Sequence, residues 1–295
     1  MICDAHVHFF SPGFFQTLAA QRQVAVADAL ARLGWDDPES PEALGDRWVA
    51  ELDTHRVAHA ALIASVPGDE DSVAIAAARH PTRLAGYFML DPTADDAENR
   101  VARALERGMR GVCLFPAMQG YSLRDERVGR VAEVLAAFAR PCVLFVHCGV
   151  LSVGARIRLG LPSRFDMSRG NPLDLQGLAQ RFPLLPIVIP HFGAGMFREA
   201  LMLADTCDNV YFDTSSSNRW MQYTPGLTLE QVFDTALGVL GAERLLFGTD
   251  SSFFPRGWNR AVFDRQTEAL QAIGATAEQM SLIVGKNFER VLGLH

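Results

Sequence analysis

The sequence predicts an α/β protein with a (β/α)8 TIM-barrel fold, and three observations lead to this prediction. The chain has 295 residues, which suits one barrel of ~250 residues that carries an insertion. Eight short, nearly continuous apolar runs follow one another along the chain, as expected of strands buried on both faces of a parallel sheet. Segments of helical composition separate these runs, a pattern typical of βα units. We therefore expect a single barrel domain over residues 1–295.

The predicted strands are rich in apolar and β-branched residues. They span Met1–His6, Val57–Ser65, Leu84–Leu90, Arg110–Phe115, Cys142–His147, Pro186–His191, Asn209–Asp213 and Arg244–Asp250. The clearest predicted helices, several of which end at glycine or precede proline, span Asp95–Gly108, Asp125–Ala139, Pro172–Phe182 and Leu229–Gly241. An open, doubly wound sheet is the alternative, but its first strand usually leads into a glycine-rich phosphate loop. Here the first run leads into a His-x-His motif, so we favour the closed barrel.

Two connections after predicted strands are much longer than the usual ~4–6 residues. The first runs from about Phe9 to Pro41, includes a predicted helix over 14–33 and forms an insertion after the first strand. The second runs from Gly149 to Gly170 and carries four arginines, namely Arg156, Arg158, Arg164 and Arg169. Both connections leave the carboxyl ends of strands, where barrel enzymes place their active sites. The sequence leaves open whether the second one completes the active site of its own chain or of a neighbour.

Composition and charge argue against several classes of protein. Apolar residues make up 49% of the chain and charged residues 21%, so a large buried core is expected. The net charge of −7 offers no basic field for nucleic acid or for an anionic membrane surface. The five cysteines are scattered without C-x-x-C spacing, and neither a leader-like segment nor an apolar run of ~18 residues is evident. We expect a cytoplasmic protein that acts on a small molecule.

The strongest motif is Asp4-Ala-His6-Val-His8 at the end of the first predicted strand. Alternate residues of a strand point to the same side, so His6 and His8 are expected to face the barrel interior together. Ligand-type residues also end three other predicted strands, namely His147, His191 and Asp250. A polar side chain that is buried in an apolar barrel needs a hydrogen-bond partner or an ion. This set of residues predicts a metal centre at the carboxyl ends of the strands.

These motifs resemble the amidohydrolase superfamily, in particular amidohydrolase family 2, which includes the aminocarboxymuconate semialdehyde decarboxylases and related decarboxylases, hydratases and hydrolases. The resemblance extends over nearly the whole chain. It rests on residues 4–8 and on four later segments, His147-Cys-Gly, His191-Phe-Gly-Ala-Gly, Gly248-Thr-Asp250 and Gly285-Lys-Asn287. Together these motifs are specific for the family and much less specific for a reaction. The resemblance implies a TIM barrel of the metal-dependent hydrolase type.

The resemblance also implies one divalent ion bound by His6, His8, His147 and Asp250. The ion is most often Zn²⁺ in this branch, with Mn²⁺ as the alternative. His191 is then the implied acid/base residue, and Asp250 is implied to move protons as well as to bind the ion. The residues themselves agree, because three imidazoles and one carboxylate suit zinc or a similar transition metal. Two-metal members usually use a bridging lysine or carboxylate, whereas the only lysine here, Lys286, lies in the C-terminal helical segment, so one ion is expected.

Two aspartates near these motifs have open roles. Asp4 either orients a ligand imidazole from behind or is held by backbone N–H groups at the start of the strand. Asp213, at the end of the seventh predicted strand, either lines the site or caps the next helix. The sequence favours neither alternative for either residue.

Four residues on the loops after the last two strands are candidate substrate-binding residues. Arg219 and Trp220 follow the seventh predicted strand, and Arg256 and Trp258 follow the eighth. A guanidinium group binds a carboxylate, and an indole ring stacks on a planar substrate. These loops are expected at the same face of the barrel as the predicted metal centre.

Three functions are compatible with the sequence. The first is metal-dependent hydrolysis of a small carboxylate, lactone or amide through a metal-activated water. The second is metal-dependent, non-oxidative decarboxylation of an aromatic or enoic acid. The chain departs from many of these decarboxylases after the last ligand, where it has Thr249-Asp250-Ser-Ser-Phe-Phe-Pro255 in place of a Ser-Asp-Tyr-Pro-like sequence. The third is a barrel that binds a small molecule without turnover. The resemblance also suggests a homodimer or a higher homo-oligomer.

Overall fold

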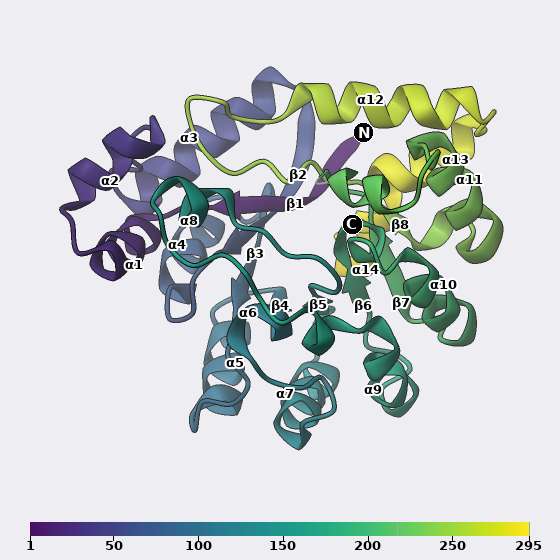
Figure 1. Ribbon diagram of the computed structural model, residues 1–295, viewed down its shortest axis with the longest axis horizontal. Coiled ribbons are helices and arrows are strands. Elements are labelled where there is room, and N and C mark those ends of the chain that lie inside the picture. Colours follow the sequence, from purple (N-terminus) through teal and green to yellow (C-terminus); the bar gives the residue numbers. More distant parts are fainter. Residues whose placement is uncertain (217, 295) are drawn as a thin grey trace.

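The computed structural model describes residues 1–216 and 218–294 and has one eight-stranded sheet at its centre (Figure 1). Neighbouring strands follow in the order β1 to β8, and every pair in this series is parallel. The strands are β1 (Ile2–Phe9), β2 (Val57–Ala64), β3 (Leu84–Met89), β4 (Gly111–Leu114), β5 (Val143–Val146), β6 (Ile187–Ile189), β7 (Val210–Asp213) and β8 (Leu245–Leu246). Each strand lies within or overlaps one predicted run, and the predicted (β/α)8 barrel is confirmed.

The segment after β8 brings the sheet back to β1. Val7 and Ser251 form a parallel bridge, and the His8 N–H donates to the Ser251 carbonyl at 2.7 Å. The Ala5 N–H donates to the Phe247 carbonyl at 2.8 Å. These contacts close the sheet into a barrel, which leaves the strands without a long exposed edge.

β1 is longer than predicted, and β8 is much shorter. β1 continues to Phe9, whereas β8 contains only Leu245–Leu246 instead of 244–250. Asp250 has φ of 57°, a left-handed conformation that no regular strand contains. The Asp250 N–H nevertheless donates to the His6 carbonyl at 3.0 Å. The irregular segment therefore still follows β1 and carries Asp250 to the carboxyl end of that strand.

Helices cover the outer face of the barrel (Figure 1). The principal helices are α3 (Pro41–Thr54), α4 (Glu70–Arg79), α5 (Ala97–Glu106), α7 (Glu126–Ala137), α9 (Gln176–Arg181), α10 (Phe197–Thr206), α11 (Leu229–Leu240), α12 (Arg260–Ala272) and α14 (Asn287–Leu292). Shorter elements are α6 (Pro116–Gln119), α13 (Ala277–Ser281), η1 (Met167–Gly170), η2 (Pro172–Leu175), η3 (Pro190–Gly193), η4 (Asn218–Tyr223), η5 (Ala242–Arg244) and η6 (Leu282–Lys286). No helix among the described residues is long and apolar enough to cross a lipid bilayer.

Two layers of apolar side chains hold the barrel and its helices together. Strand residues that point outward, such as Leu62, belong to one cluster with helix residues such as Val101. Strand residues that point inward, such as Ile63 and Phe145, form a second cluster with Phe288 of α14. The interior of the barrel is therefore packed with side chains, as in other TIM barrels. The space for a ligand lies above this packing, at the carboxyl ends of the strands.

The insertion after β1 contains two helices where the sequence predicts one over 14–33. They are α1 (Pro12–Arg22) and α2 (Val26–Leu33). α1 begins at Ser11, whose side chain accepts a hydrogen bond from the Phe14 N–H. It ends at Gln23, which has φ of 60° and donates its N–H to carbonyls of the last turn. This left-handed C-cap turns the chain and separates the two helices.

The second long connection docks on this insertion through α8 (Gly154–Arg158). Phe14, Leu30 and Ala155 belong to a third apolar cluster, separate from the two clusters of the barrel. The Arg156 Nη1 donates to Gln21 Oε1 at 2.6 Å, and the Arg158 Nη1 donates to the Leu33 carbonyl at 3.2 Å. We call α1, α2 and α8 the cap (Figure 1). The connection over 149–170 thus packs on the insertion of its own chain.

Candidate metal centre

A cavity of about 760 Å³ opens at the carboxyl ends of the strands, beside the cap. All five ligand-type residues singled out in the sequence line this cavity, namely His6, His8, His147, His191 and Asp250. They come from β1 and from the segments that follow β5, β6 and β8. The barrel topology therefore brings together residues that lie more than 240 positions apart in the sequence.

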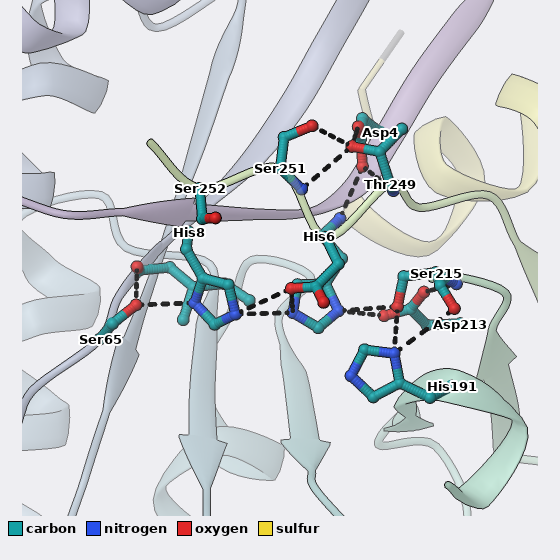
Figure 2. Close-up of polar contacts among 12 residues, drawn as sticks. Asp4, His6, His8, Ser65, His191, Asp213, Ser215, Thr249, Ser251 and Ser252 are labelled. Carbon is teal, nitrogen blue, oxygen red and sulfur yellow. Dashed lines mark hydrogen bonds and ion pairs between the residues drawn. The ribbon is translucent and has the colours of Figure 1, made fainter. Parts of the chain in front are cut away.

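Three of these side chains bring donor atoms together at the end of β1. The His8 Nε2 lies 3.1 Å from Asp250 Oδ1 and 3.3 Å from the His6 Nε2. The His6 Nε2 lies 3.7 Å from Asp250 Oδ1. Figure 2 shows the His6 and His8 rings side by side, with the same edge of each ring turned toward the other. The three donor atoms fit the spacing of ligands around one ion.

A buried carboxylate fixes the orientation and tautomer of the His6 ring. The His6 Nδ1–H donates to Asp213 Oδ2 at 2.6 Å, and both side chains are almost fully buried. Burial lowers the pKa of His6, but the carboxylates of Asp213 and Asp250 outweigh this effect and raise it overall. With the proton held on Nδ1 by Asp213, the Nε2 lone pair points toward the donor cluster. This carboxylate–histidine pairing is typical of metal ligands.

A hydroxyl group fixes the His8 ring in the same way. The Ser65 Oγ donates to the Ile63 carbonyl at 2.9 Å, so its lone pair accepts a hydrogen bond from the His8 Nδ1–H at 2.7 Å. Burial lowers the pKa of His8, which favours the neutral imidazole. The His8 Nε2 therefore also presents a lone pair to the cluster. The neutral imidazole of His8 is the form that binds a metal ion.

Asp250 is held as a carboxylate by the two histidines. Burial alone would raise the pKa of Asp250, but the neighbouring imidazoles of His8 and His6 lower it overall. The left-handed backbone at this residue turns the side chain toward β1. Aspartate is among the few residues other than glycine that adopt this conformation readily.

His191 and His147 lie at the edge of the cluster. The ring centroid of His191 is 5.1 Å from that of His6 and 5.4 Å from that of His147. The His191 Nδ1 lies 2.9 Å from Ser215 Oγ and 3.4 Å from the Ser215 carbonyl, which can only accept a hydrogen bond. Burial and the neighbouring His6 lower the pKa of His191, and burial and the neighbouring His191 lower that of His147. Both imidazoles are therefore neutral near pH 7.

The turn after β6 holds His191 in an unusual backbone conformation. His191 has φ of 54° and the following residue, Phe192, has φ of 53°. Such left-handed conformations cost about 1–3 kcal/mol each in non-glycine residues and persist where the surroundings enforce them. Here the ring of Phe192 is fully buried in the core. The buried ring holds the turn and presents His191 to the cavity.

Asp4 has the second of the two roles that the sequence left open. It accepts hydrogen bonds from the backbone N–H groups of His6 and Thr249 and from the Trp258 indole, and among the described residues it bonds to no imidazole nitrogen. Burial raises the pKa of Asp4 to about 6, while these donors favour the carboxylate. Asp4 therefore ties β1 to the segment after β8, as Figure 2 shows for Thr249. The carboxylate that orients an imidazole is Asp213.

The candidate substrate-binding residues separate into two groups. Arg219, Trp220 and Arg256 line the cavity. Trp258 is not among the described residues that line it, because its indole is 2% exposed and donates to Asp4 Oδ2 at 2.7 Å. Its observed contacts support the junction between β1 and the segment after β8, and its assignment to the substrate stays a prediction. Ser65 ends a predicted strand but belongs to no motif, so its contact with His8 could not be predicted from the sequence.

The donor set fits a divalent transition metal. His6, His8 and Asp250 offer two neutral imidazole nitrogens and one carboxylate oxygen, which suit zinc or manganese. His147 is not brought within ligand distance of these three atoms. Its Nδ1 is buried and has no hydrogen-bond partner among the described residues. A buried polar atom without a partner is rare in folded proteins, and at this position it is consistent with a missing ligand contact.

Replacement of Asp213 by asparagine is expected to weaken metal binding about 10–100-fold, the usual effect of losing the partner of a ligand imidazole. The asparagine amide would either fail to accept from the His6 Nδ1–H or place a donor against the Ser215 N–H, which now donates to Asp213 Oδ1 at 2.6 Å. Competition with a fluorescent chelator measures the affinity. Asp208→Asn, an exposed aspartate just before the same strand, is the matched control. Equal affinities in both variants would contradict the role of Asp213.

Comparison with solved structures places the fold among TIM barrels. The 5-carboxyvanillate decarboxylase of Novosphingobium aromaticivorans, solved with bound manganese, has a TM-score of 0.68 at 16% identity, with 100% of this chain and 97% of that chain covered. An amidohydrolase of Burkholderia multivorans with bound zinc has a TM-score of 0.64 at 18% identity, with 100% of both chains covered. A Pseudomonas putida protein assigned as a 2-pyrone-4,6-dicarboxylic acid hydrolase has a TM-score of 0.64 at 21% identity, with 100% and 98% covered.

Sequence comparison identifies the family. No curated protein matches the chain. The family model described as amidohydrolase matches residues 3–294, a range that includes both the histidines of β1 and the aspartate after β8. The match agrees with the resemblance that the motifs suggested. The chain belongs to the amidohydrolase family 2.

Proposed function

We propose that this chain is a single catalytic domain and a mononuclear metal-dependent hydrolase that acts on a small carboxylate, lactone or amide. One observation carries the proposal. The Nε2 atoms of His6 and His8 and the Oδ1 of Asp250 converge at the end of β1, and each imidazole is held by a hydrogen bond from its other nitrogen. Such a set of oriented polar donor atoms is costly to bury unless an ion joins them.

His6, His8, Asp250 and His147 are the proposed ligands of this ion. We propose Zn²⁺ or Mn²⁺, the ions bound in two structurally similar proteins. When bound, the ion supplies Lewis-acid catalysis, which polarises a substrate oxygen and makes water a stronger nucleophile. The unpartnered Nδ1 of His147 supports its place in this set.

His191 is the proposed general base and acid. The Ser215 carbonyl, 3.4 Å from the His191 Nδ1, favours the proton on that nitrogen and leaves the Nε2 lone pair to take a proton. The lowered pKa of His191 keeps the imidazole neutral before reaction, so that it accepts a proton from the attacking water and returns it to the leaving group. Arg256 and Trp220, which line the cavity, are placed to bind and orient the substrate.

Decarboxylation of an aromatic acid is the second candidate function. It is favoured by a row of aromatic side chains along the cavity, Phe10, Trp35 and Phe253, and by the similarity to a carboxyvanillate decarboxylase. The same donors would then orient a substrate carboxylate. The two reactions differ in their products, because only decarboxylation releases carbon dioxide.

Product analysis separates these functions. We expect the purified protein, loaded with Zn²⁺ or Mn²⁺, to hydrolyse lactones or amides from a panel that also contains aromatic carboxylates, without release of carbon dioxide. Chromatography detects hydrolysis, and a coupled carboxylase assay detects carbon dioxide. Carbon dioxide from an aromatic acid would replace the hydrolase proposal by the decarboxylase. A metal-loaded protein that turns over no member of the panel would favour the barrel that binds without catalysis.

A further inference from the structure

The lining of the active-site cavity has a net positive charge, whereas the chain as a whole has a net negative charge. Four arginines line it, namely Arg156, Arg158, Arg219 and Arg256, whereas Asp250 is the only acidic residue among its described lining residues. The lining therefore has a formal charge of 4 − 1 = +3, with histidines neutral, in a chain whose net charge is −7. A concave surface lined by one sign of charge attracts ligands of the opposite sign.

These four arginines also differ from many arginines on the surface. Surface arginines such as Arg79 and Arg100 form ion pairs with aspartate or glutamate. Within residues 1–216 and 218–294, none of the four cavity arginines forms an ion pair with a carboxylate. A guanidinium group has five N–H donors, and those used here bond to backbone carbonyls or to neutral side chains. Their charge is left for a ligand to neutralise.

The charges are held at two separate parts of the cavity. Arg256 lies beside the donor cluster, where its Nη2 donates to the Asp250 carbonyl at 3.2 Å and to Ser252 Oγ at 2.9 Å. Arg156 and Arg158 belong to the cap, where hydrogen bonds to Gln21 and to the Leu33 carbonyl hold them against the insertion. Because these contacts lie within one chain, the cap positions its arginines without a neighbouring subunit.

Aromatic rings also line the cavity, where Phe10 stacks on His8 of the donor cluster with ring centroids 5.5 Å apart. Phe10 stacks on Phe14 with ring centroids 4.0 Å apart, and Trp35 stacks on Phe253 with centroids 4.3 Å apart. The guanidinium group of Arg256 lies 4.5 Å from the centre of the Phe253 ring. All of these residues line the cavity. Aromatic side chains of this kind favour a planar, apolar middle section in the ligand.

We propose that the cavity has a second anion subsite, built by Arg156 and Arg158 of the cap from the same chain, and that the substrate is a planar dianion. One anionic group would lie at the donor cluster and Arg256, and the other at the cap. This inference rests on the proposed function for the identity of the reacting end, but the charge preference itself is independent of turnover. It also assigns the 149–170 connection to the active site of its own chain.

Calorimetric titration with terephthalate and benzoate tests the proposal, because the two planar acids differ only in a carboxylate at the far end. We expect terephthalate to bind the purified protein at least about tenfold more tightly than benzoate, as expected for a charge-assisted contact with arginine. Arg158→Gln should remove most of this preference while benzoate binding stays nearly unchanged. Arg169→Gln is the matched control, since Arg169 is on the same connection, pairs with Asp166 and is absent from the described cavity lining.

Equal affinities for the two acids in the wild-type protein would overturn the second subsite. The proposal also fails if Arg158→Gln keeps the full preference for terephthalate, or if Arg169→Gln loses it to the same extent. Arg156→Lys retains the positive charge but replaces the planar guanidinium N–H donors by an ammonium group, so it should weaken terephthalate binding less than Arg158→Gln does. Metal content and turnover are measured separately, so failure of the hydrolase proposal would be distinguished from failure of this one.

Discussion

A variant with both histidines of β1 replaced, His6→Ala/His8→Ala, is expected to lose its metal and its activity together. Two of the three clustered donor atoms disappear in this variant, and one carboxylate with a distant imidazole does not hold a divalent ion tightly. We expect about one metal atom per chain in the wild-type protein and close to none in the variant. Activity should fall by at least ~10³-fold, because Lewis-acid catalysis contributes several kcal/mol.

The control for this variant removes two histidines outside the cavity. His55 contacts Glu51, and His80 contacts Asp46, so His55→Ala/His80→Ala changes the same residue types without touching the cluster. Elemental analysis and turnover are measured for all three proteins, with circular dichroism to confirm folding. A folded His6→Ala/His8→Ala variant that keeps the wild-type metal content would refute the metal site. Loss of metal with retained activity would show that catalysis proceeds through His191 and the remaining residues alone.

The strands could be predicted from the sequence because their signal is local. Runs such as 142–147 are almost continuously apolar, and a strand buried on both faces requires that pattern. The division of the insertion into α1 and α2 was missed because Gln23 carries no glycine or proline signal, although it adopts φ of 60°. The end of β8 was missed for a similar reason, since the left-handed turn at Asp250 depends on its contacts with β1.

The candidate ligands could be found because strand-end polar residues stand out against apolar runs. The residues that hold these candidate ligands could not be found from the sequence, because their contacts join segments that are far apart in the chain. Asp213 lies 207 positions from His6, and from the sequence it could equally line the site or cap the next helix. Trp258 follows a ligand-bearing strand, as a substrate-binding residue would, yet its indole is buried against Asp4. Sequence position indicates that a loop is near the site, whereas the direction of each side chain depends on tertiary packing.

His191 differs from the proposed ligands in its position. Its ring lies next to those of His6 and His147, but it is not one of the three clustered donors. A ligand and an acid/base residue at this position would respond differently to substitution. Loss of a ligand lowers metal content, whereas loss of the acid/base residue lowers the rate and leaves metal content unchanged.

His191→Asn is the variant that tests this distinction. Asparagine adopts left-handed backbone conformations more readily than most residues, so it preserves the turn at φ of 54° and removes the imidazole. We expect kcat to fall by about 10²–10⁴-fold, the usual contribution of general acid–base catalysis. Metal content should remain at the wild-type value, and the melting temperature should change little.

The changes in kcat and in metal content together show whether His191 is an acid/base residue or a metal ligand. A fall in kcat with unchanged metal content supports the acid/base role, since the amide of asparagine cannot exchange a proton near neutral pH. A fall in metal content would instead make His191 a ligand and remove it from proton transfer. Ser215→Ala gives a graded comparison that keeps the ring, because it removes the hydroxyl that lies 2.9 Å from the His191 Nδ1 and 3.0 Å from the His6 Nδ1. A smaller loss of kcat in Ser215→Ala than in His191→Asn is expected if the imidazole itself carries the proton.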